Sequence, residues 1–271
     1  MKGKGMKIAV CIKQVPGTAQ VEIDPVTGVL KRDGVESKMN PYDLYALESA
    51  LKLKEKYGAE ITVVTMGPPQ AQAVIHEAFM MGVDAGVLLS DRRFGGADVL
   101  ATSYTISQGI RSAGDFDLII CGKQTTDGDT AQVGAELAEF LGIPHVASVC
   151  AIHGVEDGSL DVDIDQPLHV VTAAVKFPCL ITVEKGIFEP RLPSYRRKLA
   201  TADREIKVLT LDDMQDKDPA HYGLNGSPTQ VKRIFPPENN NSRELWQGED
   251  GELSGKLFKF LDDNKYLQQL R

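Results

Sequence analysis

The 271-residue sequence lacks the features that mark membrane, secreted and nucleic-acid-binding proteins. Lys, Asp or Glu interrupts every apolar run well before the roughly 18 uncharged residues that would cross a bilayer. The start is basic and then briefly apolar, but Lys13 ends the run and no small-residue cleavage site follows, so we expect no signal peptide. Lys and Arg number 30 against 38 Asp and Glu, a net charge of -8, which argues against non-specific nucleic-acid binding. These absences predict a cytoplasmic protein without membrane insertion or a nucleic-acid partner.

Cysteine and the common catalytic and nucleotide-binding motifs are also scarce. Four cysteines (Cys11, Cys121, Cys150 and Cys179) stand singly inside apolar runs, with no CxxC pair and no HExxH sequence. This spacing predicts free thiols and no metal site. A GxGxxG sequence after the first strand and a GxxxxGK[ST] sequence are both missing, which excludes a standard dinucleotide fingerprint and a P-loop.

What is present is an alternation of short apolar runs and helical patterns, in a chain that is 42% hydrophobic and 25% charged, as is typical of a globular protein. Strands are predicted at residues 7–13, 61–66, 87–90 and 117–122, and helices at 41–57, 69–82, 97–112 and 130–141. Strands that are apolar on both faces predict an open, mostly parallel, Rossmann-like sheet covered on both sides, built from right-handed βαβ units. Residues 21–34 are expected to form two extended arms around a turn.

The second half of the sequence has a different texture. Four strand-like segments at 146–154, 159–165, 168–175 and 179–184 follow one another without helices, which predicts antiparallel strands added to the parallel sheet. Residues 189–206 are basic and punctuated by proline, and a polar stretch then leads to a short amphipathic helix at about 253–267. The sequence therefore predicts an α/β domain over 1–210 and a C-terminal arm over 211–271 with too few apolar residues for its own core.

Ligands of open parallel sheets bind beyond the carboxyl ends of the strands, which here fall at residues 11–14, 66–68 and 122–134. The third stretch leads into a helix, so the amides near Asp129, Thr130 and Ala131 are expected to form an anion site. Asn40 is expected to cap the helix that begins at Pro41. By themselves, these residues fit either a nucleotide site or an ordinary capped helix.

A longer pattern then becomes recognisable. It consists of the segments AVCIKQVP (9–16), DPVTGVLKRDGVESKMNPYDLYALE (24–48), VVTMGPPQA (63–71), LIICGKQTTDGDTAQVGAELAEFLG (118–142) and FPCLITVEKGIFEPRLPS (177–194). In this order they resemble the β (small) subunit of electron transfer flavoproteins. The resemblance implies an α/β fold of the adenine nucleotide alpha hydrolase-like type and a heterodimer with a larger α subunit. It further implies that a bound flavin, and no side chain, carries the redox chemistry.

The resemblance also implies a cofactor site. Its members are Cys11, Asn40, Pro41, Tyr42, Asp43, Met66, Lys123, Gln124, Thr125, Thr126, Asp127, Gly128, Asp129, Thr130, Ala131, Gln132, Val133 and Gly134. The expected ligand is FAD, because the DGDTAQVG stretch looks like the electron-bifurcating members of anaerobes. The alternative is AMP, as in simple electron carriers.

In the bifurcating branch the electrons come from NADH, and they pass to ferredoxin or flavodoxin and to a partner flavin dehydrogenase of acyl-CoA or lactate type. Residues 189–206 match the loop that docks that dehydrogenase, with Tyr195 at the anchor position followed by Arg196, Arg197 and Lys198. The arm from 211 is expected to wrap the α subunit. A stand-alone nucleotide-binding protein of the universal-stress type is a further alternative.

Overall fold

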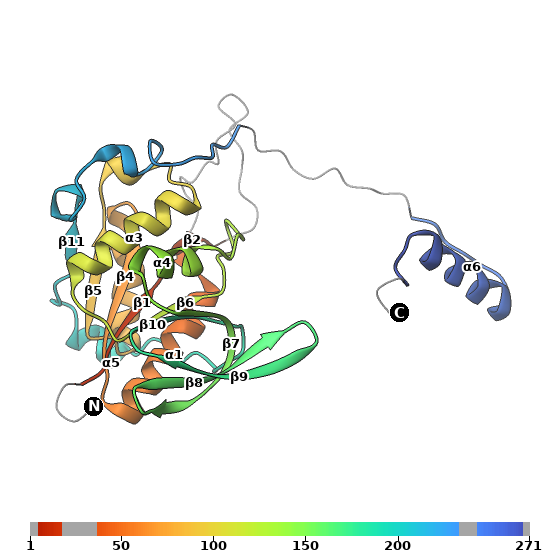
Figure 1. The fold of residues 1–271 in the computed structure, drawn as a ribbon, viewed down its shortest axis with the longest axis horizontal. Coiled ribbons are helices and arrows are strands. Elements are labelled where there is room, and N and C mark those ends of the chain that lie inside the picture. The colour runs from red at the N-terminus through yellow and green to blue at the C-terminus, as the bar shows by residue number, and fades with distance from the viewer. Residues whose placement is uncertain (1–4, 18–36, 233–242, 268–271) are drawn as a thin grey trace. The chain divides into compact units, whose positions relative to one another are not determined.

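The computed structural model describes residues 5–17, 37–232 and 243–267, drawn in colour in Figure 1. Its contacts divide the chain into two compact units, residues 1–232 and 233–271, which are described separately. The predicted extended arms at 21–34 lie outside the described residues.

The first unit is built on a nine-stranded sheet with the order β11-β5-β4-β1-β6-β10-β7-β8-β9 (Figure 1). The strands from β11 to β7 in this order are parallel, and β8 and β9 continue the sheet as an antiparallel extension. The prediction of a mostly parallel sheet with added antiparallel strands is confirmed. The strand bounds are β1 Lys7–Cys11, β4 Glu60–Met66, β5 Ala85–Leu89, β6 Leu118–Gly122, β7 His145–Glu156, β8 Ser159–Gln166, β9 His169–Lys176, β10 Cys179–Val183 and β11 Lys207–Leu209.

The expectation that all four strands after Pro144 are antiparallel is wrong for two of them. β10 pairs in parallel with β6 and β7, and it is buried along its whole length, as central parallel strands are. The β8–β9 hairpin separates β7 from β10 in the sequence, so the crossover between these two parallel strands contains no helix.

Helices cover both faces of the sheet. α1 (Pro41–Tyr57) and α2 (Gln72–Met81) pack in one core cluster, which contains Leu47 and Phe79. α3 (Val99–Ala113) and α4 (Val133–Leu141) pack in the other, which contains Ile110 and Leu137. Shorter elements complete the unit: β2 (Gln14–Pro16), β3 (Ser37–Met39), η1 (Pro69–Ala71), η2 (Arg92–Phe94), α5 (Tyr195–Ala200), η3 (Leu211–Asp213) and η4 (Pro219–His221).

The strand order reverses at β1. From β1 the chain adds β4 and then β5 on one side, after which β6 pairs with β1 on its other side. In open α/β sheets this reversal leaves a crevice beyond the carboxyl ends of the two strands, where ligands bind. The topology therefore directs attention to the ends of β1 and β6.

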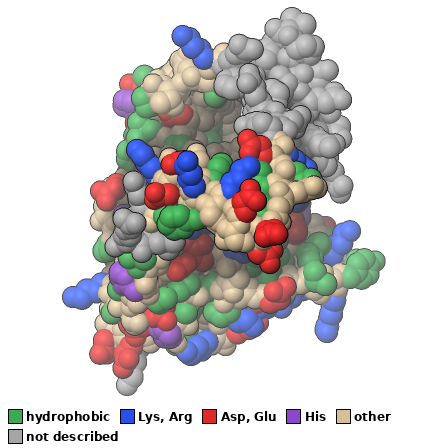
Figure 2. All heavy atoms as spheres, turned by 90° about the vertical axis from the view of Figure 1, so that its right-hand side faces the viewer, with side chains coloured by type: hydrophobic (Ala, Val, Ile, Leu, Met, Phe, Trp, Pro, Cys, Tyr) green, Lys and Arg blue, Asp and Glu red, His purple; other side chains and the backbone are tan. Residues whose placement is uncertain are grey.

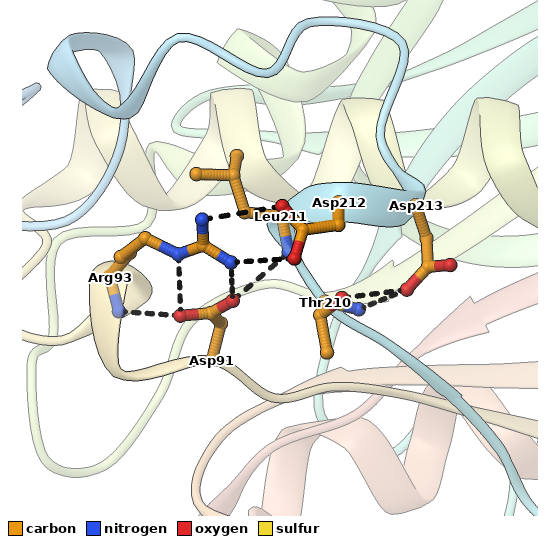
Figure 3. Close-up of polar contacts among 6 residues, drawn as sticks. All are labelled: Asp91, Arg93, Thr210, Leu211, Asp212 and Asp213. Atoms are coloured by element: carbon orange, nitrogen blue, oxygen red, sulfur yellow. Dashed lines mark hydrogen bonds and ion pairs between the residues drawn. The ribbon is translucent and has the colours of Figure 1, made fainter.

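The segment after β11 belongs to the first unit. Figure 3 shows Arg93 between Asp91 and Asp212, while Leu211 donates its amide to Asp91 at 3.2 Å. Further along, Tyr222 is fully buried in the second cluster. The sequence placed the start of the arm at residue 211, whereas the compact units divide after Lys232, because residues 211–232 bond to the η2 region and to α3.

The second unit contains α6 (Asp250–Asp263), close to the predicted helix at 253–267. Trp246 stacks edge-on against Phe260, with ring centroids 5.7 Å apart, and Leu257 and Phe258 are exposed. No helix among the described residues is long and apolar enough to span a membrane. In the space-filling view of Figure 2, acidic and basic side chains are interspersed.

Candidate functional site

The carboxyl ends of β1 and β6 bring two cysteines together. Cys11 and Cys121 are register partners in these strands. The neighbouring Cys11 thiol and burial raise the pKa of Cys121, so its thiol stays protonated and unreactive at neutral pH. Cys11 and Met66, at the end of the neighbouring β4, both pack against the cluster beneath α3 and α4.

Gly122 allows the start of α1 to reach the end of β6. A Cβ at this position would lie 2.5 Å from Asp43 Oδ1 and 2.7 Å from the backbone of Tyr42. Any side chain here would therefore displace the first turn of α1 from the strand. Asp43, in that first turn, is buried and accepts the amide of Lys13 at 2.7 Å.

The fully buried Asn40 side chain connects two segments, the start of α1 and the loop after β6. Its Nδ2 donates to Asp43 Oδ1 and to the carbonyl of Gln124, both at 2.9 Å, and its Oδ1 accepts the amide of Thr126 at 3.2 Å. The prediction that the Asn40 side chain caps α1 is wrong, since it makes no bond to the helix amides. The side chain instead fixes the loop after β6, which lies more than 80 residues away in the sequence.

Lys13 joins the loop after β1 to the loop after β6. Its ammonium group contacts both carboxylate oxygens of Asp127 at 2.8 Å. Burial alone would raise the pKa of Asp127, but the bond and the charge of Lys13 hold the pKa below its usual range. Asp127 therefore remains an anion that is already paired, which removes much of its repulsion for a phosphate.

The loop over 123–132 turns through two unusual backbone conformations. Asp129 and Ala131 have φ of 54° and 56°, in the left-handed region that Asp tolerates better than most residues. The Asp129 amide bonds the carbonyl of Thr125 at 2.9 Å, and its carboxylate accepts from the Gln124 side chain. Both acidic residues of the loop are thus engaged within the protein.

The helix that follows begins later than predicted. α4 starts at Val133 and its first backbone bond runs from the Glu136 amide to the Gln132 carbonyl, so residues 133–135 supply the amides without intrahelical acceptors. The expected position of these amides, at 129–131, is corrected by one helical turn, because the left-handed residues keep the loop non-helical. Gly134 lets α4 approach β10: a Cβ there would lie 2.5 Å from Thr182 Cγ2.

Lys123 is paired with a carboxylate of the protein, so it is not a free cation for a phosphate. Its ammonium group lies 2.6 Å from the Glu184 carboxylate, just after β10, and this bond raises the pKa of the lysine. Its amide donates to the carbonyl of Val183 at 3.1 Å. The start of the loop is therefore fastened to β10.

The structure thus brings most of the predicted site residues to one end of the sheet, on the ends of β1, β4 and β6 and the starts of α1 and α4 (Figure 1). Residues 126–132 are exposed there. Sequence reasoning placed Lys13 only in the strand-end stretch 11–14, without a role in the site, and it missed Thr182 and Glu184. Each follows or ends a strand of the parallel sheet, and that position was the signal that could have identified them.

The arrangement fits an anionic nucleotide. Amides at the N-terminus of α4 favour a phosphate, and the loop before them presents small side chains such as Gly128 and Ala131. The ion pair with Lys13 offsets the repulsion that Asp127 would exert on a phosphate, and the Asp129 carboxylate is engaged by the Gln124 side chain. Among the described residues, no group of three or more His, Cys, Asp or Glu could hold a metal ion.

The predicted docking segment 189–206 lies elsewhere on the first unit, against the C-terminal part of α2. Arg191 is bound by both carboxylate oxygens of the buried Glu48 at 2.8 Å. Arg197 donates to the carbonyl of Met81 at 2.5 Å, so it fixes α5 to α2. The Tyr195 side chain is 73% exposed, and Arg196 and Lys198 are exposed beside it.

Comparison with known proteins resolves the family. Residues 27–214 match the model of the electron transfer flavoprotein domain, which is more than half of the chain. The chain belongs to the electron transfer flavoprotein family. It is 45% identical to the electron transfer flavoprotein subunit beta of Clostridium acetobutylicum, over 97% of this chain and 100% of that protein.

Other relatives are also similar to this chain over nearly its whole length. The subunit beta of Megasphaera elsdenii is 44% identical over 91% of this chain and 94% of its own length. Subunit CarD of the caffeyl-CoA reductase-Etf complex of Acetobacterium woodii is 42% identical over 95% of this chain and 98% of its own. The family match and these relatives support an electron transfer flavoprotein small subunit, a protein of flavin-related electron transfer with an α subunit as partner.

Proposed function

We propose that this small subunit binds FAD at the ends of β1, β4 and β6 and, with its α subunit, takes electrons from NADH and bifurcates them. One electron would pass to ferredoxin or flavodoxin and the other, through the α-subunit flavin, to a partner flavin dehydrogenase. When bound, the flavin supplies the hydride and one-electron chemistry. The chain's own residues would bind and orient it.

The observation that carries the proposal is the pairing of the loop carboxylates. Asp127 is paired with the Lys13 ammonium group and Asp129 accepts a hydrogen bond from Gln124, while the amides of residues 133–135 stand at the α4 N-terminus. Small residues at 128, 130 and 131 leave this backbone accessible to a diphosphate, which FAD has and AMP lacks. The similarity to CarD, a subunit of a reductase-Etf complex, points in the same direction.

The second candidate is a carrier subunit with a structural AMP. The same helix amides would bind its single phosphate, and only the α-subunit flavin would carry electrons. In that case the roles of Asn40, Asp43 and the 123–134 loop are unchanged, but the small subunit takes no part in electron transfer.

The nucleotide content of the purified heterodimer distinguishes the two. After denaturation, released flavin and adenine nucleotide are separated and counted per αβ dimer. Two FAD per dimer is the expected result, whereas one FAD with one AMP would replace the first candidate by the second.

For the partner dehydrogenase, an acyl-CoA or lactate-type enzyme, we propose docking through the loop at 189–206. Tyr195 offers an exposed aromatic anchor on a segment that Arg191 and Arg197 hold rigid, with Arg196 and Lys198 beside it. Rigid aromatic anchors with basic neighbours are frequent hot spots of protein interfaces.

Substitution of the anchor tests this docking. Tyr195→Ala is expected to weaken electron transfer to the dehydrogenase by about 2 kcal/mol of binding energy, because a hot-spot side chain is lost. NADH oxidation with an artificial acceptor should be unaffected. The control is Leu168→Ala, which removes a comparably exposed side chain outside the loop. Equal coupling in Tyr195→Ala and the parent protein would assign docking to another surface.

A further inference from the structure

Asp43 is a buried carboxyl group whose protonation state plays no part in the roles described above. It lies in the first turn of α1, is 5% exposed, and accepts hydrogen bonds from the Lys13 amide and from Asn40 Nδ2. Its Oδ1 lies against Gly122, which is only half-buried. The carboxyl group therefore lies directly behind Gly122, the last residue of β6, beside the crevice at the ends of β1 and β6.

We propose that nucleotide binding in this crevice is linked to protonation of Asp43, so that the subunit holds its nucleotide more tightly as the pH falls. The proposal rests on the nucleotide site described under the proposed function. Asp43 acts here as a positioning residue, because it reaches the loop after β6 only through Asn40.

The charges around Asp43 leave it without a side-chain cation of its own. Lys13 approaches through its backbone amide, while its ammonium group binds Asp127 at 2.8 Å. The carboxylate of Asp127 adds negative charge from the β6–α4 loop, whereas the Cys121 thiol belongs to the core cluster on the other face of the sheet. The nearest compensation is the Asn40 amide and the start of α1.

Burial is the main cause of an unusual titration at this position. It raises the pKa of Asp43 to about 7, although the bonds from Asn40 and Lys13 and the charge of Lys13 oppose the rise. The group is therefore divided between its charged and neutral forms at neutral pH. The phosphates of a nucleotide would disfavour the charged form further, and linkage requires that the neutral form then favour the nucleotide by the same factor.

The sign and size of the effect follow. If binding raises the pKa of Asp43 by one further unit, the complex holds more protons than the free protein, and affinity falls as the pH rises from about 6 to 9. One unit corresponds to an affinity change of about tenfold over this range. Near pH 7.5, binding would then take up about half a proton per site.

The experiment titrates the nucleotide-free αβ heterodimer with FAD by calorimetry between pH 6 and 9, in two buffers of different ionisation enthalpy. FAD suits the purpose because its diphosphate does not titrate in this range. Three small subunits are compared: the parent, Asp43→Asn, and Asp117→Asn. Asp117 is the matched control, since it also accepts a backbone amide, that of Lys7 at 2.8 Å, but lies at the opposite end of β6.

We expect the parent and Asp117→Asn to show the same loss of affinity with rising pH, and Asp43→Asn to show a flat profile at one of the two sites. Retention of the parent's slope in Asp43→Asn would overturn the proposal. If Asp43→Asn does not fold, the number of protons that the parent takes up on binding decides. An uptake near zero at pH 7.5 would contradict the proposal. Binding at the small subunit that is independent of pH overturns this inference alone, whereas no nucleotide binding there at any pH overturns the proposed function as well.

Discussion

Asn40 shows how much a single buried amide can organise. Its side chain bonds Asp43, the Gln124 carbonyl and the Thr126 amide, which belong to the start of α1 and to the loop after β6. Gly122 allows these two segments to approach each other closely beside it. The residue thereby sets the shape of the proposed nucleotide site without any need to contact the ligand.

Removal of this amide should therefore loosen the loop. For Asn40→Ala we expect a loss of about 1–3 kcal/mol in the free energy of unfolding, because the buried Asn40 amide no longer bonds Asp43 or the part-buried backbone groups of Gln124 and Thr126. Urea denaturation measures the loss, and nucleotide content should fall with it. Asn264→Ala is the control, since that exposed amide bonds only the Phe260 carbonyl. A stability equal to the parent's would contradict the assigned role.

The sequence identified Asn40 as a candidate residue but did not predict which groups its side chain bonds. A cap is a local interaction, and the preference of Asn for positions before helices is visible in the sequence. The partners at Gln124 and Thr126 become neighbours only when β6 inserts beside β1. The same reason hid the pairs Lys13–Asp127 and Lys123–Glu184, whose members are 114 and 61 residues apart.

At the scale of elements, the close contact between α4 and β10 depends on a glycine, which has no side chain to keep the two elements apart. Gly134 faces Thr182, and a Cβ would approach its Cγ2 to 2.5 Å. We expect Gly134→Ala to lower the free energy of unfolding by about 1–3 kcal/mol through overpacking, and to displace the amides at the α4 N-terminus. Thermal unfolding and nucleotide content measure the two effects.

Gly128 provides the comparison for this prediction. It lies in the same loop, but an added Cβ would meet only the Thr125 hydroxyl at 3.4 Å, an ordinary contact. Gly128→Ala should thus leave the free energy of unfolding nearly unchanged. If both variants unfold alike, the tight packing of α4 on β10 is not what stabilises this region.

Element prediction from the sequence succeeded where local patterns decide. The predicted helix at 41–57 coincides with α1, because Pro41 can start it and the apolar face at Leu47 and Leu51 buries. The predicted direction of β7 and β10 was wrong. Whether a strand joins a sheet in parallel depends on where the chain returns, and the hairpin between them looked like a continuous antiparallel series.

At the scale of the whole molecule, the division after Lys232 separates a packed unit from a short one. The buried residues of both core clusters lie at or before Tyr222 among the described residues. The helix α6 exposes Leu257 and Phe258, which fits our proposal that the C-terminal segment, predicted from 211 onward, wraps the α subunit.

A chain that ends at Lys232 tests this organisation. We expect its melting temperature to match that of the full chain within a few degrees, because the cores are complete. Less α subunit should copurify with it, since the exposed face of α6 is gone. A steep drop in melting temperature would mean that residues 233–271 support the first unit, and undiminished copurification would separate the arm from the α subunit.

The reversal of strand order at β1 also has a consequence for biosynthesis. β1 is made first, β6 follows about a hundred residues later, and Lys123 then requires Val183 and Glu184 at the end of β10. A chain emerging from the ribosome thus cannot assemble the crevice until β10 has left the exit tunnel. If the crevice holds a nucleotide as proposed, the nucleotide can be loaded only after synthesis has passed β10.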